Sequence, residues 1–263
     1  MAISIIVMGA AGRMGATISR LVEEADDLAL VAVVERPEAE ARLAGYAASG
    51  VFASSDVAAA AAQFPGAVII DFTAPEASMV NARAAAAAGC PIIIGTTGFS
   101  EEQLAELDAL AETALVFRSA NMSVGVNVIM DILPKLTALL GEAYDIEMTE
   151  IHHNKKKDAP SGTALLLAEP LLKARGLGSA DINTNRFDVR EPRKHDEIGI
   201  QSLRGGDVVG VHTVYYMGPG ERIELTHHAH SRENFANGAL RAARWINTQT
   251  PGRVYNMQDV LHS

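Results

Sequence analysis

The side chains best suited to acid/base chemistry are concentrated in the segment 150–163. Two histidines and three lysines lie within the six consecutive positions 152–157. The formal net charge of the chain is −10, and like charges repel, so folding alone gives little reason to gather these cations. Ser161 precedes an apolar run and is expected to begin a helix whose free backbone N–H groups bind anions. A solvated basic loop is the plain alternative. Because two independent anion-binding features adjoin, we favour a receptor for a small anion with more than one carboxylate.

The composition limits the kind of protein that carries this segment. The chain has 263 residues, 48% of them hydrophobic and 21% charged, as in a globular protein of one large or two ordinary domains. Its single cysteine, Cys90, excludes an internal disulfide. We recognise no signal peptide at the start and no uninterrupted apolar stretch that approaches bilayer length. A sequence pI of about 5.3 argues against a nucleic-acid partner. We expect a cytoplasmic protein that binds neither nucleic acid nor membranes.

The N-terminal residues have the pattern of a dinucleotide-binding unit. Residues 3–8 resemble a buried parallel strand, and glycines follow at positions 9, 12 and 15. A helix, a second strand at 28–34 and the acidic Glu35 come next. In such a unit the glycines permit a tight turn, close approach of pyrophosphate and close packing of helix on strand. The spacing is G-x-x-G-x-x-G instead of G-x-G-x-x-G, so the prediction depends on the surrounding strand, helix and acid.

The end of the second strand bears on the choice of cofactor. Glu35 is suited to accept a hydrogen bond from a ribose 2′-hydroxyl, as in enzymes that use NADH. Arg36 is suited to pair with a 2′-phosphate, as in enzymes that use NADPH. Because the two residues are adjacent, we predict that the protein accepts either cofactor.

Alternating helices and strands continue after this unit and predict a doubly wound parallel sheet with a ligand at the carboxyl ends of its strands. A capping box at 73–76 is expected to open a helix that runs to Ala88, and Ser100 to cap another. The other predicted elements are a helix at 56–63 and strands at 67–72, 91–94 and 114–117. Residues 72–73, 95–97 and 120–122 fall at the carboxyl ends of three of these strands, where nicotinamide and ribose are expected.

The pattern changes after Ser123 to that of an α+β domain with a mixed or antiparallel sheet. Ser231 is expected to cap a last helix that ends near Asn247. The predicted elements are a helix at 126–140, a strand at 143–151, the helix after Ser161, a loop at 176–196, and strands at 198–203, 210–216 and 222–230. We therefore expect a dinucleotide-binding domain (1–123), a substrate-binding and oligomerisation domain (124–232), and a C-terminal helix and tail (233–263) that return to the first domain.

The segment 150–163, placed after a Rossmann unit, resembles the signature E-x-H-H-x-x-K-x-D-x-P-S-G-T-A of the 4-hydroxy-tetrahydrodipicolinate reductase (dihydrodipicolinate reductase) family. The resemblance covers nearly the whole chain. It includes the motifs at 9–15, 71–73, 95–98, 121–127 and 235–239. One position departs from the pattern: Ala74 stands where relatives often have arginine, which removes a cation near the cofactor and leaves the balance between NADH and NADPH open.

The resemblance implies an activity and a set of site residues. The expected reaction transfers hydride from NADH or NADPH to a cyclic unsaturated imine dicarboxylate, after loss of water, in the diaminopimelate and lysine pathway. His152 and Lys156 are then the acid/base pair, His153 contacts the substrate, and the amides of Gly162 and Thr163 hold a carboxylate. The expected oligomer is a homotetramer. The cofactor residues implied are Gly9, Ala10, Ala11, Gly12, Arg13, Met14, Glu35, Arg36, Gly95, Thr96, Thr97, Ser119, Ala120, Asn121 and Met122.

Three other interpretations compete with this one. An acylating semialdehyde dehydrogenase needs a cysteine nucleophile, but Cys90 stands at the entrance of a predicted strand, at the wrong end of the sheet. A metal site is conceivable because histidines are numerous, but adjacent histidines on a strand point to opposite faces, and lysines beside His152 repel a divalent cation. A nicotinamide-binding sensor explains the first domain and leaves the basic segment without a purpose. We predict no metal.

Overall fold

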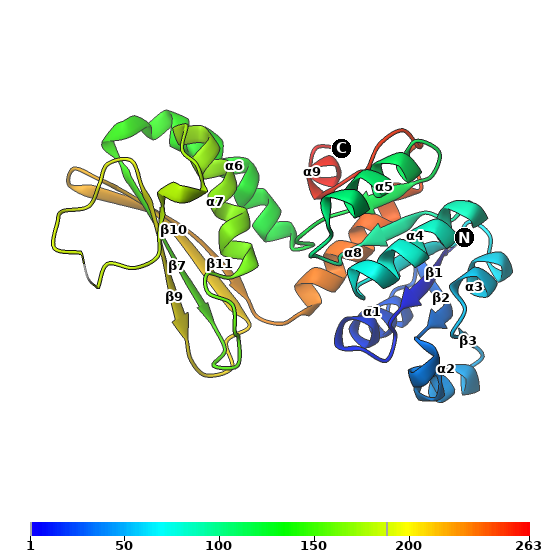
Figure 1. Ribbon diagram of the computed structural model, residues 1–263. Helices are drawn as coiled ribbons and strands as arrows, with labels where there is room; N and C mark the ends of the chain where they lie inside the picture. Colours follow the sequence, from blue (N-terminus) through cyan, green and yellow to red (C-terminus); the bar gives the residue numbers. More distant parts are fainter. Residues whose placement is uncertain (1, 188) are drawn as a thin grey trace. The chain divides into compact units, whose positions relative to one another are not determined.

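The computed structural model describes residues 2–187 and 189–263, which form two compact units (Figure 1). Unit 1 contains the chain up to Val124 together with Arg232–Ser263, and unit 2 contains Gly125–Ser231.

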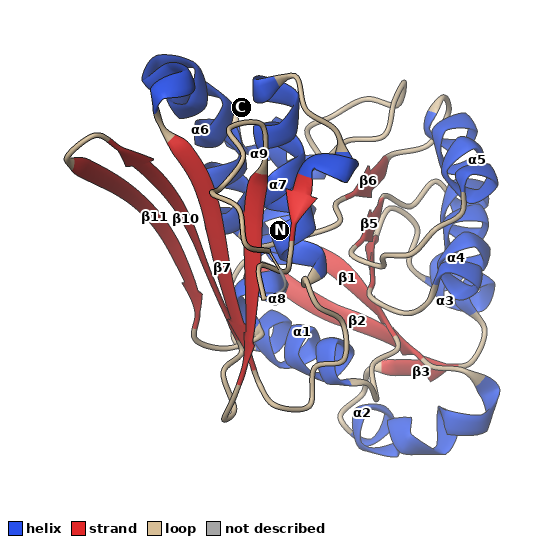
Figure 2. Ribbon diagram, turned by 60° about the vertical axis from the view of Figure 1, so that its left-hand side comes forward, coloured by secondary structure: helices blue, strands red, loops and turns tan. Residues whose placement is uncertain are grey.

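Unit 1 is built on a six-stranded parallel sheet with the strand order β3-β2-β1-β4-β5-β6 (Figure 2). The strand order reverses between β1 and β4, and ligands of open α/β sheets bind at such a point. The predicted doubly wound parallel sheet is confirmed. The strands are β1 (Ile3–Met8), β2 (Leu28–Val34), β3 (Phe52–Ser54), β4 (Val68–Asp71), β5 (Ile92–Ile94) and β6 (Val116–Arg118).

Helices cover both faces of this sheet because its central strands are apolar on both sides. Ile5, Val7 and Ile70 pack against helices α1 (Arg13–Glu23), α8 (Glu233–Ile246) and α9 (Met257–Leu261). Ile6 and Ile69 face the other way and pack against helices α3 (Val57–Gln63), α4 (Pro75–Ala88) and α5 (Glu101–Ala111) (Figure 2). Alternate residues of one strand thus enter two different hydrophobic cores.

The C-terminal segment packs into unit 1. A Cβ atom at Gly238 of α8 would collide with the carbonyl oxygen of Met122, so only glycine permits this close approach. Trp245 makes edge-to-face contacts with Phe117 and Tyr255, at centroid distances of 6.4 and 5.2 Å. The backbone of Tyr255 also bonds to both neighbours of Phe117, with Arg118 N to Tyr255 O at 2.8 Å and Tyr255 N to Val116 O at 2.9 Å. The tail thereby extends the sheet beside β6.

The predicted helix caps have mixed outcomes. Ser100 forms the expected capping box with Gln103, and Ser161 accepts a hydrogen bond from the Ala164 amide. The predicted capping box at 73–76 is wrong: α4 begins after Ala74, and the Thr73 hydroxyl donates instead to Asp71 Oδ1 at 2.7 Å. The prediction for α8 is also wrong, because its N-cap is Arg232, which makes no side-chain cap bond. At Thr73 the buried carboxylate of Asp71 thus accepts the hydrogen bond of the hydroxyl, and the hydroxyl does not cap α4.

Several short elements were not predicted from the sequence. They lack the length over which a hydrophobic period is recognisable. They are the 3₁₀ helix η1 (Pro37–Leu43), α2 (Ala44–Ala48), β3, η2 (Gly141–Ala143), η3 (Ser179–Asp181), β8 (Ile182–Asn183) and α9.

Unit 2 is built on a five-stranded mixed sheet with the order β11-β10-β7-β9-β8. The pairs β7–β9 and β8–β9 are parallel, and β10 is antiparallel to both β7 and β11, so the predicted mixed sheet is confirmed. One face packs against helices α6 (Val124–Leu140) and α7 (Gly162–Arg175), with Ile146, Met148 and Val214 among its core residues. The longer strands are β7 (Asp145–His152), β9 (Ile198–Arg204), β10 (Gly210–Gly218) and β11 (Glu221–Ala229).

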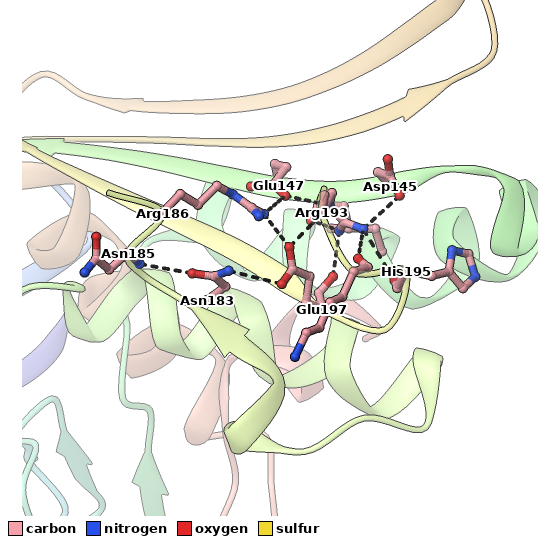
Figure 3. A network of polar contacts seen from close by, with 10 residues as sticks. Asp145, Glu147, Asn183, Asn185, Arg186, Arg193, His195 and Glu197 are labelled. Carbon is pink, nitrogen blue, oxygen red and sulfur yellow. Dashed lines mark hydrogen bonds and ion pairs between the residues drawn. The ribbon is translucent and has the colours of Figure 1, made fainter. Parts of the chain in front are cut away.

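The segment that leads into β9 is held to β7 by ion pairs (Figure 3). Arg193 pairs with Glu147 and Asp145, both at 2.8 Å, and donates to the carbonyl oxygens of Ile146 and Glu197. Arg186 pairs with Glu147 at 2.8 Å and with Glu197 at 2.6 Å. Glu147 lies on the face of β7 opposite to its core residues, as the alternation of a strand requires.

One stretch of the described chain, Val124–Ala143, is long and apolar enough to cross a membrane, with a mean hydropathy of 1.5. The stretch is not an uninterrupted apolar run, because Asn127, Asp131 and Lys135 stand within it. The stretch contains Pro134 and the ion pair Lys135–Asp131 at 2.9 Å, and Val126 and Leu133 pack into the core of unit 2. A single such helix is weak evidence for a membrane span, because a helix that packs on a hydrophobic core meets the same criterion.

Candidate functional sites in the two units

Unit 1 contains a cavity of about 640 Å³ at the point where its strand order reverses. Residues that follow β1, β2 and β4 line it, which places it at the carboxyl ends of the strands. Its lining residues include Gly9, Gly12, Glu35, Arg36, Arg42, Phe72, Thr73 and Ala74.

The glycine turn after β1 is shaped by close backbone contacts. Gly9 has a φ of +61°, which other residues rarely adopt, and Gly12 N donates to Gly9 O at 2.8 Å. A Cβ at Gly15 would collide with the carbonyl oxygen of Gly9, so the third glycine permits α1 to pack directly on the turn. Two of the three predicted roles, the tight turn and the close packing of the helix, are thus present, although the spacing of the glycines differs from the usual one.

Charged side chains at the rim of this cavity form hydrogen bonds with the glycine turn, and they include both a carboxylate and guanidinium groups. Glu35 accepts hydrogen bonds from the amides of Ala11 and Arg36, both at 3.1 Å. Arg42 donates to the Ala11 carbonyl oxygen at 2.8 Å. A carboxylate at the end of β2 suits a ribose diol, and the guanidinium groups suit phosphate. The residues present therefore fit a nicotinamide dinucleotide.

A buried carboxylate, Asp71, organises the ends of the neighbouring strands. It is fully buried and accepts hydrogen bonds from the Thr73 amide at 2.8 Å, the Thr96 hydroxyl at 3.3 Å and the Asn81 amide group at 2.8 Å. The Ser78 hydroxyl also donates to Thr96 at 2.9 Å. These bonds join the ends of β4 and β5 and fix Thr96, one of the predicted cofactor residues.

The predicted cofactor residues occupy one edge of the sheet, after successive strands. Gly9, Gly12, Glu35 and Arg36 line the cavity, and Ala10, Ala11, Arg13 and Met14 belong to the same turn and the start of α1. Gly95, Thr96 and Thr97 follow β5, and Ser119, Ala120, Asn121 and Met122 follow β6. Those seven are outside the lining of the cavity.

In unit 2 the predicted acid/base histidine is bound to a buried carboxylate. Glu150 is fully buried, and its Oε2 lies 2.6 Å from His152 Nδ1. Because residues two apart in a strand share a face, both side chains project from β7 toward the core side. Arg204 at the end of β9 also binds Glu150, with Nη2 2.7 Å from Oε1 and Nη1 2.8 Å from Oε2.

The start of α7 is part of the same cluster. Ser161 N donates to Glu150 Oε1 at 3.1 Å, while the Ser161 hydroxyl accepts from Ala164 N at 3.2 Å. That hydroxyl also lies 3.0 Å from Nε2 of His212, which comes from β10. The rings of His212 and His152 meet edge to face at a centroid distance of 5.1 Å. Four elements, β7, β9, β10 and α7, thus meet at one buried carboxylate.

The remaining predicted residues surround this cluster. Lys156 is half-buried in the basic segment, and its ammonium group lies 3.0 Å from Asp158. His153 directly follows β7, and its Nδ1 accepts from the Lys155 amide at 3.2 Å. Gly162 and Thr163 are the first residues of α7, and a Cβ at Gly162 would meet no atom within 4 Å. The open space beside Gly162 suits an anionic group at the helix start.

Burial and hydrogen bonding shift the pKa values in opposite directions. Burial opposes the charge on Glu150, but hydrogen bonds from Arg204, Ser202 and His152 outweigh it and lower the pKa of Glu150 to about 2. Burial lowers the pKa of His152, although the hydrogen bond and the negative charge of Glu150 act to raise it. Burial also lowers the pKa of His212 to about 4, assisted by the charge of a protonated His152. The cluster at neutral pH therefore contains a carboxylate, a guanidinium and neutral imidazoles.

Cys90 and the possible metal ligands show no arrangement suited to catalysis or metal binding in the described part of the chain. The buried thiol of Cys90 lies near the carbonyl oxygens of Ala61 and Phe64, and burial raises its pKa, which makes it a poor nucleophile. Over residues 2–187 and 189–263, no three His, Cys, Asp or Glu side chains are grouped so as to hold a metal ion.

The sequence prediction omitted Glu150, Arg204, His212, Asp71 and Arg42 from the site residues. For Glu150 a signal was present, because a strand at 143–151 places it on the same face as His152. Arg204 and His212 come from strands far along the chain, and only the pairing of Glu150 with His212 and of His152 with Arg204 brings them close.

Comparisons with known proteins agree over the whole chain. The family model described as "Dihydrodipicolinate reductase, N-terminus" matches residues 3–122, and that described as "Dihydrodipicolinate reductase, C-terminus" matches residues 125–261. The 4-hydroxy-tetrahydrodipicolinate reductase of Nitratidesulfovibrio vulgaris strain Hildenborough is 59% identical over 262 residues, which cover 99% of this chain and 100% of the relative. That of Anaeromyxobacter dehalogenans is 48% identical and covers 98% of this chain and 97% of the relative.

Solved structures share the fold. A dipicolinate-bound dihydrodipicolinate reductase from Paenisporosarcina sp. TG-14 superposes with a TM-score of 0.79 at 23% identity and covers 97% of this chain and 98% of its own. A probable dehydrogenase from Thermotoga maritima gives a TM-score of 0.63 at 13% identity, over 98% of this chain and 92% of its own. At these identities the likeness concerns the fold alone.

Proposed function

The chain belongs to the dihydrodipicolinate reductase family of NAD(P)H-dependent oxidoreductases, and on this premise we propose that it reduces 4-hydroxy-tetrahydrodipicolinate to tetrahydrodipicolinate. This reduction is a step of diaminopimelate and lysine biosynthesis. The observation that carries the proposal is the cluster of unit 2, where a buried histidine, a basic segment and the start of a helix adjoin around Glu150. In this proposal unit 1 binds the dinucleotide and unit 2 binds the substrate.

The proposed reaction consumes one hydride and one proton and releases one water. Loss of water from the substrate ring leaves a conjugated C=C–C=N system. A nicotinamide dinucleotide held by unit 1 would supply the hydride. In the substrate a new C–H bond forms at the far carbon of the conjugated system, and the electron pair moves toward nitrogen. Protonation of the resulting enamine on carbon restores the C=N bond.

The residues of unit 2 suit each requirement of this reaction. The start of α7 offers the amides of Gly162 and Thr163 to a substrate carboxylate, and His153 lies at the end of β7 to contact the ring. A cation and helix-terminal amides near the ring nitrogen stabilise the negative charge that develops there more in the transition state than in the ground state. We propose that Lys156 is the cation that stabilises this charge.

His152 and Lys156 are the proposed acid/base pair. An ammonium group and an imidazole are both able to deliver the proton that the enamine requires. His152 is neutral near pH 7 because burial lowers its pKa, and a neutral imidazole either accepts a proton or relays one. Lys156 is half-buried, its charge acts on His152, and it would supply the positive charge that the developing anion needs.

For the cofactor, we propose that Glu35 and Arg36 together allow both NADH and NADPH to bind. In this proposal the turn 9–14 binds the pyrophosphate, and residues 95–97 and 119–122 bind the nicotinamide end of the cofactor. A homotetramer in the cytoplasm is proposed from the family resemblance. Sedimentation of the purified chain would contradict the tetramer if it showed a monomer at micromolar concentration.

The experiment that tests the function is a coupled assay. The purified chain is added to the preceding enzyme of the pathway, which forms the unstable substrate, and oxidation of NADH or NADPH is followed. We expect oxidation that requires both enzymes. Cofactor binding without substrate-dependent oxidation would overturn the proposal and favour a nicotinamide-binding sensor.

A further inference from the structure

Glu150 is the fully buried carboxylate at the centre of the unit 2 cluster, and its bonds go to three separate elements. They reach His152 on β7, the Ser161 amide at the start of α7, and the guanidinium of Arg204 on β9. Replacing a buried ion pair by apolar residues is often neutral or stabilising, so stability alone gives little reason for a charge here. The buried charge of Glu150 is better explained by the way its hydrogen bonds fix the positions of the neighbouring groups.

The first neighbour is the imidazole of His152. A carboxylate only accepts hydrogen bonds, so the contact of 2.6 Å requires a proton on His152 Nδ1 and leaves Nε2 as the acceptor nitrogen of the neutral ring. A Cβ at Gly210 would lie 3.1 Å from Nε2, so the glycine on β10 keeps that nitrogen uncovered. The ring is thereby fixed in tautomer and in direction.

The second neighbour is the start of α7. Glu150 Oε1 accepts from Ser161 N at 3.1 Å, and the Ser161 hydroxyl caps the same helix through the amide of Ala164. The next two residues are Gly162 and Thr163, whose amides are the proposed ligands of the substrate carboxylate. One carboxylate thus holds both the proposed acid/base group and the proposed anion site.

We infer that Glu150 is a positioning residue that sets the tautomer of His152 and, through the Ser161 amide, aligns the helix start with it. The inference rests on the proposed function for its kinetic consequence, but the tautomer of His152 is measurable without substrate. The charged and titratable groups that face His152 are Glu150, Lys156, Arg204 and His212.

The test compares two ion-paired carboxylates of the same strand, of which only Glu150 is buried. Glu147 also lies on β7 and pairs with two arginines, but it faces the other side of the sheet (Figure 3). With Glu150→Gln we expect kcat to fall about 10–100-fold, the range seen when metal-bound histidines lose the hydrogen-bond partner that fixes their tautomer. We also expect the ¹⁵N signals of His152, assigned with His152→Gln, to lose the pure Nδ1–H pattern, and the Kd of pyridine-2,6-dicarboxylate to rise. Glu147→Gln should lower the melting temperature and leave the other three readouts unchanged.

A second variant covers the case in which Glu150→Gln does not fold. Glu150→Asp keeps the charge that Arg204 needs, but withdraws the carboxylate by one methylene, so we expect a folded protein with an altered His152 spectrum. Unchanged ¹⁵N signals in either variant, or equal losses of kcat in the Glu147 and Glu150 variants, would overturn the inference. If the wild-type protein shows no substrate-dependent turnover, the proposed function fails, and the spectra still decide the role of Glu150.

Discussion

The two candidate sites are built from different parts of the chain. The cavity of unit 1 is shaped by backbone, with Gly9, Gly12 and Gly15 in close contact with one another. The cluster of unit 2 is built from side chains, in which Glu150 joins Arg204 and His152. A site made of backbone is damaged when atoms are added, whereas a site made of buried charges is damaged when atoms are removed and a partner stays unpaired. The following predictions test this difference, from the largest expected effect to the smallest.

The largest effect is expected in the basic segment. Lys156→Ala should lower kcat by roughly 10²–10⁴-fold, because the reaction loses a proton donor. Steady-state kinetics in the coupled assay measure it. Lys157→Ala is the matched control, since it removes the same charge from an exposed position of the same segment. An unchanged kcat with a raised KM would make Lys156 an anchor for substrate instead.

The next effect concerns stability against pH in the unit 2 cluster. Burial lowers the pKa of His212 from 6.5 to about 4, so the unfolded chain takes up a proton at a pH where the folded protein does not. Stability should therefore fall as the pH decreases from about 6.5 to about 4, by on the order of 3 kcal/mol.

Urea unfolding at several pH values measures this loss. In His212→Gln the pH dependence over that interval should become shallower, leaving the part due to groups such as His152 and His227, whose pKa values burial also lowers. His195→Gln, at an exposed position, is the control and should keep the wild-type slope. A wild-type slope in the His212 variant would show that His212 is not held neutral by the fold.

Adding one methyl group tests the backbone site. Gly15→Ala should destabilise unit 1 by about 1–3 kcal/mol and weaken NADH binding, because the new Cβ collides with the Gly9 carbonyl oxygen. Gly45→Ala is the counterpart in α2, where a Cβ meets nothing within 4 Å, and it should stabilise by about 0.5–1 kcal/mol. Thermal melts and fluorescence titration with NADH give both quantities. Equal effects of the two substitutions would refute the role of close packing.

The smallest effect is expected at the rim of the cavity. Arg36→Ala should lower kcat/KM for NADPH by about tenfold and change the value for NADH little, because only NADPH carries the 2′-phosphate. The wild-type values for the two cofactors should be comparable. A large wild-type preference for either cofactor would contradict the balance assigned to Glu35 and Arg36, and binding titrations with each cofactor provide a readout apart from turnover.

Local patterns were sufficient where an element is long and carries its own signal. The strands at 3–8 and 28–34 were predicted with the bounds that the structure shows, and the helix after Ser161 begins at the predicted cap. The pattern was insufficient at residue 73, because the Thr73 hydroxyl bonds to Asp71 instead of capping α4. The three-residue strand β3 also escaped prediction, since it pairs along only one edge and has no period of its own.

The sequence by itself determined the Rossmann unit, the mixed second sheet and the identity of the segment 150–163, because each depends on residues that are neighbours in the chain. The tertiary structure alone decided that Glu150 lies opposite His212 and that Arg204 lies opposite His152. Strand register follows from burying one face of a sheet against distant helices, and a shift by one residue would turn every side chain to the other face. The surroundings of the proposed acid/base histidine are therefore a property of the folded sheet of unit 2.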